Sequence, residues 1–124
     1  MQLWDQYFTQ NDTRIFFIEY NAECAKEWQV THDRVTVDSG DQADVDFLRK
    51  FVNKHGGGFD VIVDDGGHKM VQQMTSLIHL FPSLRSGGLY FLEDLHTSYI
   101  EKYGGGYLKK TRFPFSFTLH TKNI

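Results

Sequence analysis

The sequence has few cysteines, no long apolar run and no excess of basic charge. Its one cysteine, Cys24, excludes an internal disulfide and a cysteine zinc cluster, and fits a reducing, cytoplasmic compartment. No apolar run approaches the roughly 20 residues that span a bilayer, and the N-terminus MQLWDQYF lacks the features of a signal peptide. The 13 basic and 16 acidic residues give a formal charge of −3, with no basic stripe for nucleic acid. We therefore expect a cytoplasmic protein that binds neither membrane nor nucleic acid.

The composition that is present is typical of one small globular domain. A chain of 124 residues is long enough for a single hydrophobic core. Its hydrophobic fraction of 40% and aromatic fraction of 15% argue against a disordered chain.

Short apolar runs alternate with amphipathic stretches along the chain. We expect strands at 14–20, 34–40, 59–65 and 87–95, the first of them buried on both faces, and helices at 21–29, 42–58 and 69–84. Asn21 would cap the first helix. The packed face of the last helix would consist of Met70, Met74, Leu77, Ile78 and Phe81. The alternation predicts an α/β fold with a mostly parallel, doubly wound sheet.

A carboxylate stands at the end of every expected strand. In open parallel sheets, ligands bind outside the carboxyl ends of the strands. A carboxylate at the first strand end, Glu19, suits the two hydroxyls of a ribose, and Asp41 with Gln42 suits an adenine edge. We call the edge formed by the carboxyl ends of the strands the rim. The half of the rim at the first two strands is therefore predicted to be a nucleoside pocket.

The other half of the rim holds the motif DDGGH, residues 64–68, and the pair Glu93-Asp94. If the third and fourth strands are neighbours, carboxylates from both converge on a hard cation such as Mg²⁺. Asp64 would point away from the cation because successive strand side chains alternate, and His68 would be a general base beside it. Two other interpretations stay open: a solvated turn, since Asp and Gly favour turns, and a metal-dependent hydrolase.

Four segments together resemble a known family: SGDQADVDFL (39–48), FDVIVDDGGHKMVQQMTSL (59–77), LFPSLRSGGLYFLEDLHTSY (80–99) and YGGG (103–106). They are similar to the S-adenosylmethionine-dependent O-methyltransferases of the macrocin type. These are class I enzymes that methylate sugar hydroxyls in macrolide biosynthesis. The resemblance covers roughly residues 2–106, and its motifs occur in the family's order and approximate spacing.

The resemblance implies a Rossmann-like sheet of strand order 3-2-1-4-5, followed by two more strands. It implies in-line transfer of a methyl group to a hydroxyl of a sugar or another small molecule, with S-adenosylmethionine and Mg²⁺ as cofactors. The implied metal ligands are Asp65, Glu93 and Asp94, and the implied base is His68. The implied cofactor side consists of Glu19, Asp41, Gln42 and Asp64.

Two parts of the family pattern have no counterpart in the sequence. Family members carry a first strand and a Gly-rich cofactor loop ahead of the segment that MQLWDQYF resembles, and their last two strands are not matched in 107–124. We therefore expect a partial methyltransferase domain at 1–106, truncated at both ends, a divergent tail at 107–124, and a gap between the strands at 14–20 and 59–65. The alternative is a catalytically inactive relative or partner-binding domain, completed by another chain or a second copy along the exposed strand edges.

Overall fold

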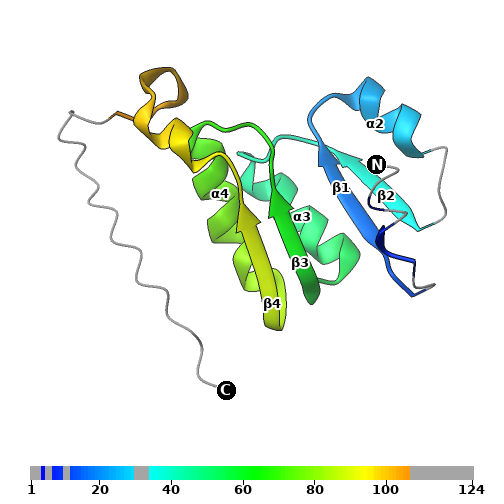
Figure 1. The fold of residues 1–124 in the computed structure, drawn as a ribbon. Coiled ribbons are helices and arrows are strands. Elements are labelled where there is room, and N and C mark those ends of the chain that lie inside the picture. Colours follow the sequence, from blue (N-terminus) through cyan, green and yellow to red (C-terminus); the bar gives the residue numbers. More distant parts are fainter. Residues whose placement is uncertain (1–3, 5–6, 10–11, 30–33, 107–124) are drawn as a thin grey trace.

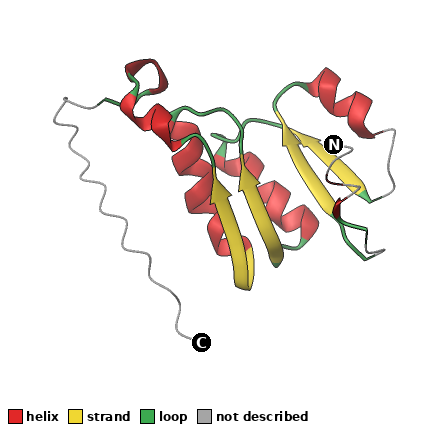
Figure 2. Ribbon diagram, viewed as in Figure 1, coloured by secondary structure: helices red, strands yellow, loops and turns green. Residues whose placement is uncertain are grey.

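In a computed structural model, strands and helices alternate along the chain, as the sequence predicts. The structure describes residues 4, 7–9, 12–29 and 34–106, and the predicted tail at 107–124 lies outside them. The elements are β1 (Ile15–Glu19), α2 (Ala22–Gln29), β2 (Val35–Ser39), α3 (Val45–His55), β3 (Phe59–Asp64), α4 (Met70–Leu80) and β4 (Leu84–Leu92) (Figure 1). Short 3₁₀ helices at Phe81–Ser83, Leu95–Tyr99 and Glu101–Tyr103 complete them (Figure 2).

The strands form two separate parallel pairs. β1 pairs with β2, with Ile15 opposite Val35, and β3 pairs with β4, with Val61 opposite Leu89. All of these strands point in the same direction (Figure 1). Within the described part of the chain, no strand lies between β1 and β3, so the predicted gap in the sheet is confirmed.

Side-chain and glycine caps set the helix ends. Asn21 Oδ1 accepts a hydrogen bond from the Glu23 backbone N–H at 2.9 Å, which confirms it as the cap of α2. Asp44 caps α3 by accepting from the backbone N–H groups of Asp46 and Phe47, so this helix begins at Val45 and not at 42 as predicted. It ends at Gly56, whose φ of 86° closes the helix in the left-handed conformation.

Helix α3 packs against both strand pairs. Its buried residues Leu48 and Phe51 lie in one cluster with Phe16 of β1 and Phe59 of β3. The rings of Phe16 and Phe59 meet at 5.9 Å between centroids, so the core continues across the gap.

A second, smaller cluster lies on the other face of the first pair. It consists of Ala25, Val35 and Val37, with Ile15 and Phe17 packed against it. β1 therefore sends alternate side chains to two clusters. Its residues are nevertheless all partly exposed, so the prediction that it is buried on both faces is wrong. The cause is its second edge, which has no strand beside it among the described residues.

The buried face of α4 also differs from the prediction. Gln73, Ser76 and Leu80 are buried, whereas Ile78 is 58% exposed and Phe81, beyond the helix end, is 45% exposed. The two polar side chains tolerate burial because each is hydrogen-bonded: Gln73 Nε2 donates to the backbone oxygen of Glu93 at 2.9 Å, and Ser76 Oγ to that of Gln72 at 2.7 Å.

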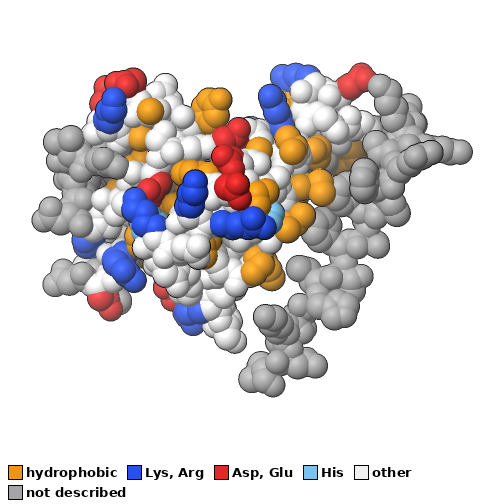
Figure 3. Space-filling model, turned by 180° about the vertical axis from the view of Figure 1, so that it is seen from behind, with side chains coloured by type: hydrophobic (Ala, Val, Ile, Leu, Met, Phe, Trp, Pro, Cys, Tyr) orange, Lys and Arg blue, Asp and Glu red, His pale blue; other side chains and the backbone are white. Residues whose placement is uncertain are grey.

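Charge on the surface is mixed. Seen from behind, Lys and Arg side chains are interspersed with Asp and Glu, and no broad basic field covers the described part of this face (Figure 3). None of the described helices is long and apolar enough to span a membrane.

A partly exposed ion-pair network joins β2 to the end of α3. His55 Nε2 lies 2.6 Å from Asp38 Oδ2, and Lys54 Nζ donates to Asp38 Oδ1. Burial opposes ionisation of Asp38, but the hydrogen bonds from Lys54 and His55 outweigh it and hold the pKa of Asp38 below its ordinary value of 3.8.

We expect the contribution of Asp38 to stability to depend on pH. Because its pKa is lower in the folded state, this contribution is fully present above pH 3.8 and is lost as the pH falls through the folded-state value. The free energy of unfolding, measured by urea denaturation, should therefore exceed that of D38N at neutral pH, and the difference should shrink in acid. The matched variant D12N, at an exposed aspartate, should show no such trend. If the difference in free energy of unfolding between wild type and D38N stayed constant with pH, the lowered pKa of Asp38 would be contradicted.

Candidate metal and cofactor site

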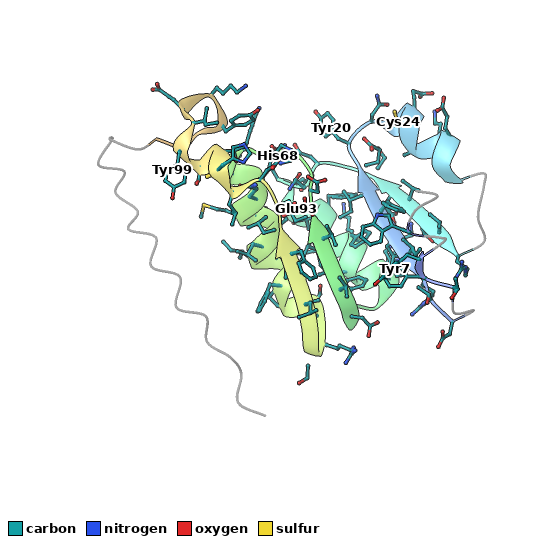
Figure 4. The ribbon with its side chains drawn as sticks, viewed as in Figure 1. Tyr7, Tyr20, Cys24, His68, Glu93 and Tyr99 are labelled. Carbon is teal, nitrogen blue, oxygen red and sulfur yellow. The ribbon has the colours of Figure 1, made fainter. Side chains whose placement is uncertain are left out.

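The predicted site residues follow the carboxyl ends of the strands. Glu19 ends β1 and Asp41 follows β2, while Asp65 follows β3 and Glu93 and Asp94 follow β4. Since the strands are parallel and point the same way, these ends lie along one edge of the molecule (Figure 1). Figure 4 shows His68 and Glu93 near the ends of β3 and β4, and Tyr20 beyond the end of β1.

Three of the predicted residues come together in one cluster. Asp65, His68 and Asp94 each offer a ligand atom, and these atoms all lie within 4.8 Å of one another. His68 Nε2 is 3.3 Å from Asp94 Oδ2. Glu93 is not in this cluster among the described residues; its backbone N–H donates to the backbone oxygen of Asp64 at 3.0 Å and so extends the pairing of β3 with β4.

The donor set fits a hard cation. Two carboxylates supply the oxygen ligands that Mg²⁺ prefers, and the exposure of Asp65 and Asp94 leaves room for the waters that Mg²⁺ retains. Without a cation, neighbouring carboxylates repel each other. The geometry is therefore compatible with a metal held between the ends of β3 and β4.

The backbone of Asp94 is bent into an unusual conformation. Its φ of 52° and ψ of 37° make it the one non-glycine residue with positive φ in the described segments. The backbone oxygen of Asp94 accepts hydrogen bonds from the N–H and the hydroxyl of Thr97, at 3.1 and 2.8 Å, and Thr97 is 2% exposed. This buried anchor holds the bend, which directs the Asp94 carboxylate toward His68.

Asp64 and Asp65 point in opposite directions, as strand alternation predicts. Asp65 is exposed in the cluster, whereas Asp64 is 8% exposed and accepts hydrogen bonds from Tyr90 OH at 3.0 Å and Gln42 Nε2 at 3.1 Å. Burial, together with the Asp64 carboxylate, raises the pKa of Tyr90 far above its ordinary value, so Tyr90 remains a neutral donor.

Sequence reasoning missed three polar residues beneath the rim: Gln73, Ser76 and Tyr90. The signal that could have found Gln73 and Ser76 is their helical spacing with Leu80, which places two polar groups in an apolar stripe.

Two residues of the predicted nucleoside pocket, Glu19 and Asp41, lie at the ends of β1 and β2, whereas the side chain of the third, Gln42, is hydrogen-bonded to Asp64, Gly67 and Ser76 on the side of β3 and α4. Glu19 Oε1 accepts from the Asn21 backbone N–H at 2.8 Å, and Asp41 Oδ1 accepts from that of Ala43 at 2.8 Å. Each carboxylate is thereby fixed at the end of β1 or β2, apart from the cluster of Asp65, His68 and Asp94.

No family model matches the chain. Curated relatives match about 105 of its residues. A tetracenomycin rhamnosyl 3'-O-methyltransferase of Streptomyces olivaceus is 39% identical over 85% of this chain and 25% of that protein. The mycinamicin VI 2''-O-methyltransferase of Micromonospora griseorubida and the demethylmacrocin O-methyltransferase of Streptomyces fradiae are each 32% identical over the same shares. The chain is related to the macrocin-type sugar O-methyltransferases.

The solved structures agree with this relationship. MycE methyltransferase, in complex with Mg, SAH and mycinamycin VI, aligns at a TM-score of 0.63 and 27% identity, over 85% of this chain and 34% of that chain. The α/β fold predicted from the sequence is thus confirmed as part of a macrocin-type methyltransferase fold. The chain spans about a quarter of the length of the curated relatives that it matches.

The strained backbone of Asp94 leads to a test with two variants that both lack the carboxylate. Glycine adopts positive φ freely and alanine does not, so we expect D94G to exceed D94A in free energy of unfolding by about 1 kcal/mol. Urea denaturation monitored by circular dichroism measures the difference. Equal stabilities of the two variants would show that residue 94 is not left-handed in solution.

Proposed function

We propose that this chain contributes the metal and cofactor rim of an S-adenosylmethionine-dependent, Mg²⁺-assisted O-methyltransferase. The observation that carries the proposal is the convergence of Asp65, His68 and Asp94 within 4.8 Å. It occurs in a fold similar to that of MycE, which was solved with Mg and SAH.

The residues divide into three roles. Asp65 and Asp94 hold the cation, with Glu93 as the third predicted ligand beside Asp94. His68 accepts the proton that the acceptor hydroxyl releases, since imidazole is the side chain that most often serves as a general base. When bound, Mg²⁺ supplies Lewis acidity and S-adenosylmethionine supplies the methyl group.

The cofactor side is formed by the ends of β1 and β2. Glu19 would accept hydrogen bonds from the ribose hydroxyls, and Asp41 would face the adenine edge. The side chains of Gln42 and Asp64, which are hydrogen-bonded to each other, would support this side from beneath. The relatives' names identify hydroxyls of sugars attached to macrolides or other polyketides, so the proposed acceptor is a sugar hydroxyl on a small molecule. Its proposed setting is the reducing cytoplasm, which the single cysteine fits.

We expect the folded chain to bind SAH more tightly in the presence of Mg²⁺, as measured by isothermal titration calorimetry. D65N and D94N should abolish the Mg²⁺ effect because each removes a ligand charge, and E19Q should weaken SAH binding by about tenfold through loss of a charge-assisted hydrogen bond. E27Q, at an exposed position of α2, is the matched control and should bind like wild type. H68Q should bind SAH normally and lose methyl transfer. A folded sample that binds no SAH would refute the proposed activity for this chain.

A second candidate is a non-catalytic relative that binds a partner. The separation of β1 from β3 favours it, because each strand presents an edge that another chain or a second copy could pair with. Light scattering after size-exclusion chromatography distinguishes the two. A monomer that transfers methyl groups excludes the partner-binding alternative, and a defined oligomer without turnover supports it.

A further inference from the structure

A network of polar side chains lies directly beneath the metal cluster. Gln42 is at its centre: its Nε2 donates to Asp64 Oδ1 at 3.1 Å and to Ser76 Oγ at 2.9 Å, and its Oε1 accepts from the Gly67 backbone N–H at 2.6 Å. Tyr90 completes the network from β4 by donating to Asp64 Oδ2 at 3.0 Å.

The network is buried at Asp64 and Ser76 and partly buried at Gln42 and Tyr90, and its hydrogen-bonding groups are matched. Asp64 and Ser76 are 8% and 2% exposed, and no buried side-chain nitrogen or oxygen in the described part of the chain lacks a partner. Ser76 Oγ accepts from Gln42 and donates to the backbone oxygen of Gln72 at 2.7 Å, so its donor and acceptor roles do not conflict. Breaking one member therefore leaves a buried polar group unsatisfied.

Gly66 leaves free the space that the Gln42 amide occupies. The φ of Gly66 is outside the left-handed region, so backbone conformation does not require glycine there. A Cβ at Gly66 would instead lie 2.1 Å from Gln42 Oε1 and 3.0 Å from Gln42 Cδ. A side chain at this position would require the amide of Gln42 to shift. Glycine at position 66 and glutamine at position 42 are thus two parts of one contact.

The network holds the Asp64 side chain and the Gly67 backbone N–H, which lie on the two sides of Asp65. Asp64, held by Gln42 and Tyr90, immediately precedes Asp65, and Gly67, whose N–H is held by Gln42, immediately precedes His68. We infer that four residues orient Asp65 and His68 as positioning residues: Gln42, Asp64, Ser76 and Tyr90. That the oriented cluster binds a metal rests on the proposed function. They act through the turn and do not touch the metal.

Hydrogen exchange tests the anchoring of the turn without any metal. In the full chain, Q42A should speed exchange of the Gly67 amide by about tenfold, because it removes one hydrogen bond. Y90F keeps the ring and removes one bond to Asp64, so it should give a smaller increase in the same segment. N53A removes an exposed amide from α3 and is the matched control, with no expected change. Unchanged exchange in Q42A would overturn the anchoring.

A double-mutant cycle tests the contact between positions 42 and 66. G66A should displace the Gln42 amide and destabilise the chain in urea denaturation. In the Q42A background the added methyl group has space, so the double variant should lose less free energy than the sum of the single variants. Additive losses would overturn the contact.

Affinity for Mn²⁺, measured by electron paramagnetic resonance with the metal alone, tests the positioning role. Q42A should raise the Kd for Mn²⁺ by about tenfold, since the ligands remain but are held less firmly. V37A is the structural control: it empties a core site that is 1% exposed, in the separate cluster of the first strand pair, and should lower stability without changing Kd. Equal effects of Q42A and V37A on Kd would overturn the inference. If wild type binds no Mn²⁺, the proposed metal function fails, while the exchange and double-mutant results still decide whether the network anchors the turn.

Discussion

Helix α3 joins the two halves of the rim through side chains. Leu48 and Phe51 pack on Phe16 from one strand pair and on Phe59 from the other. No backbone ladder connects β1 with β3 in the described part of the molecule, so this packing sets the relation of the two pairs. The carboxylates after β1 and β2 and those after β3 and β4 face a common edge only while α3 holds both pairs. The proposed function therefore depends on a hydrophobic contact remote from every charged group of the site.

The directions of the aspartate side chains at the end of β3 have a different cause. Strand alternation turns Asp64 inward and Asp65 outward, so adjacent residues of the same chemistry serve opposite purposes. The inward carboxylate is satisfied by neutral donors, Tyr90 and Gln42, and the outward one is available to a cation. A motif of two aspartates thus combines a structural residue with a proposed ligand, and only the direction of each side chain distinguishes them.

Much of the fold could be predicted from the sequence because its signals are local. Apolar runs identified each strand in the described part of the chain, although β4 spans Leu84–Leu92 and not 87–95 as predicted, and the cap at Asn21 is visible in the sequence itself. The rule that ligands bind at the strand ends brought Asp65 and Asp94 to one place. That rule did not show that Glu93 lies outside the cluster, since this depends on the bend at Asp94.

The remaining errors arose where distant segments decide the outcome. The predicted buried face of α4 was wrong because Gln73 and Ser76 are buried with hydrogen bonds to Glu93 and Gln42. Helical periodicity does not reveal such bonds to distant segments. β1 was predicted as fully buried because its composition is that of an inner strand, yet burial also requires a neighbour on each edge.

The separation of the hydrophobic clusters has a consequence for how the molecule opens. One cluster belongs to β1, α2 and β2, and the other is centred on α3 and α4 with β3 and β4. If β1, α2 and β2 open together, Phe16 and Ile18 lose their packing in the cluster around α3. No strand ladder between β1 and β3 has to break in the described part of the chain. Local unfolding follows such boundaries. The two halves of the rim thus rest mainly on different hydrophobic clusters, so local opening of the first would separate Glu19 from Asp65 and Asp94 while β3 stays paired with β4.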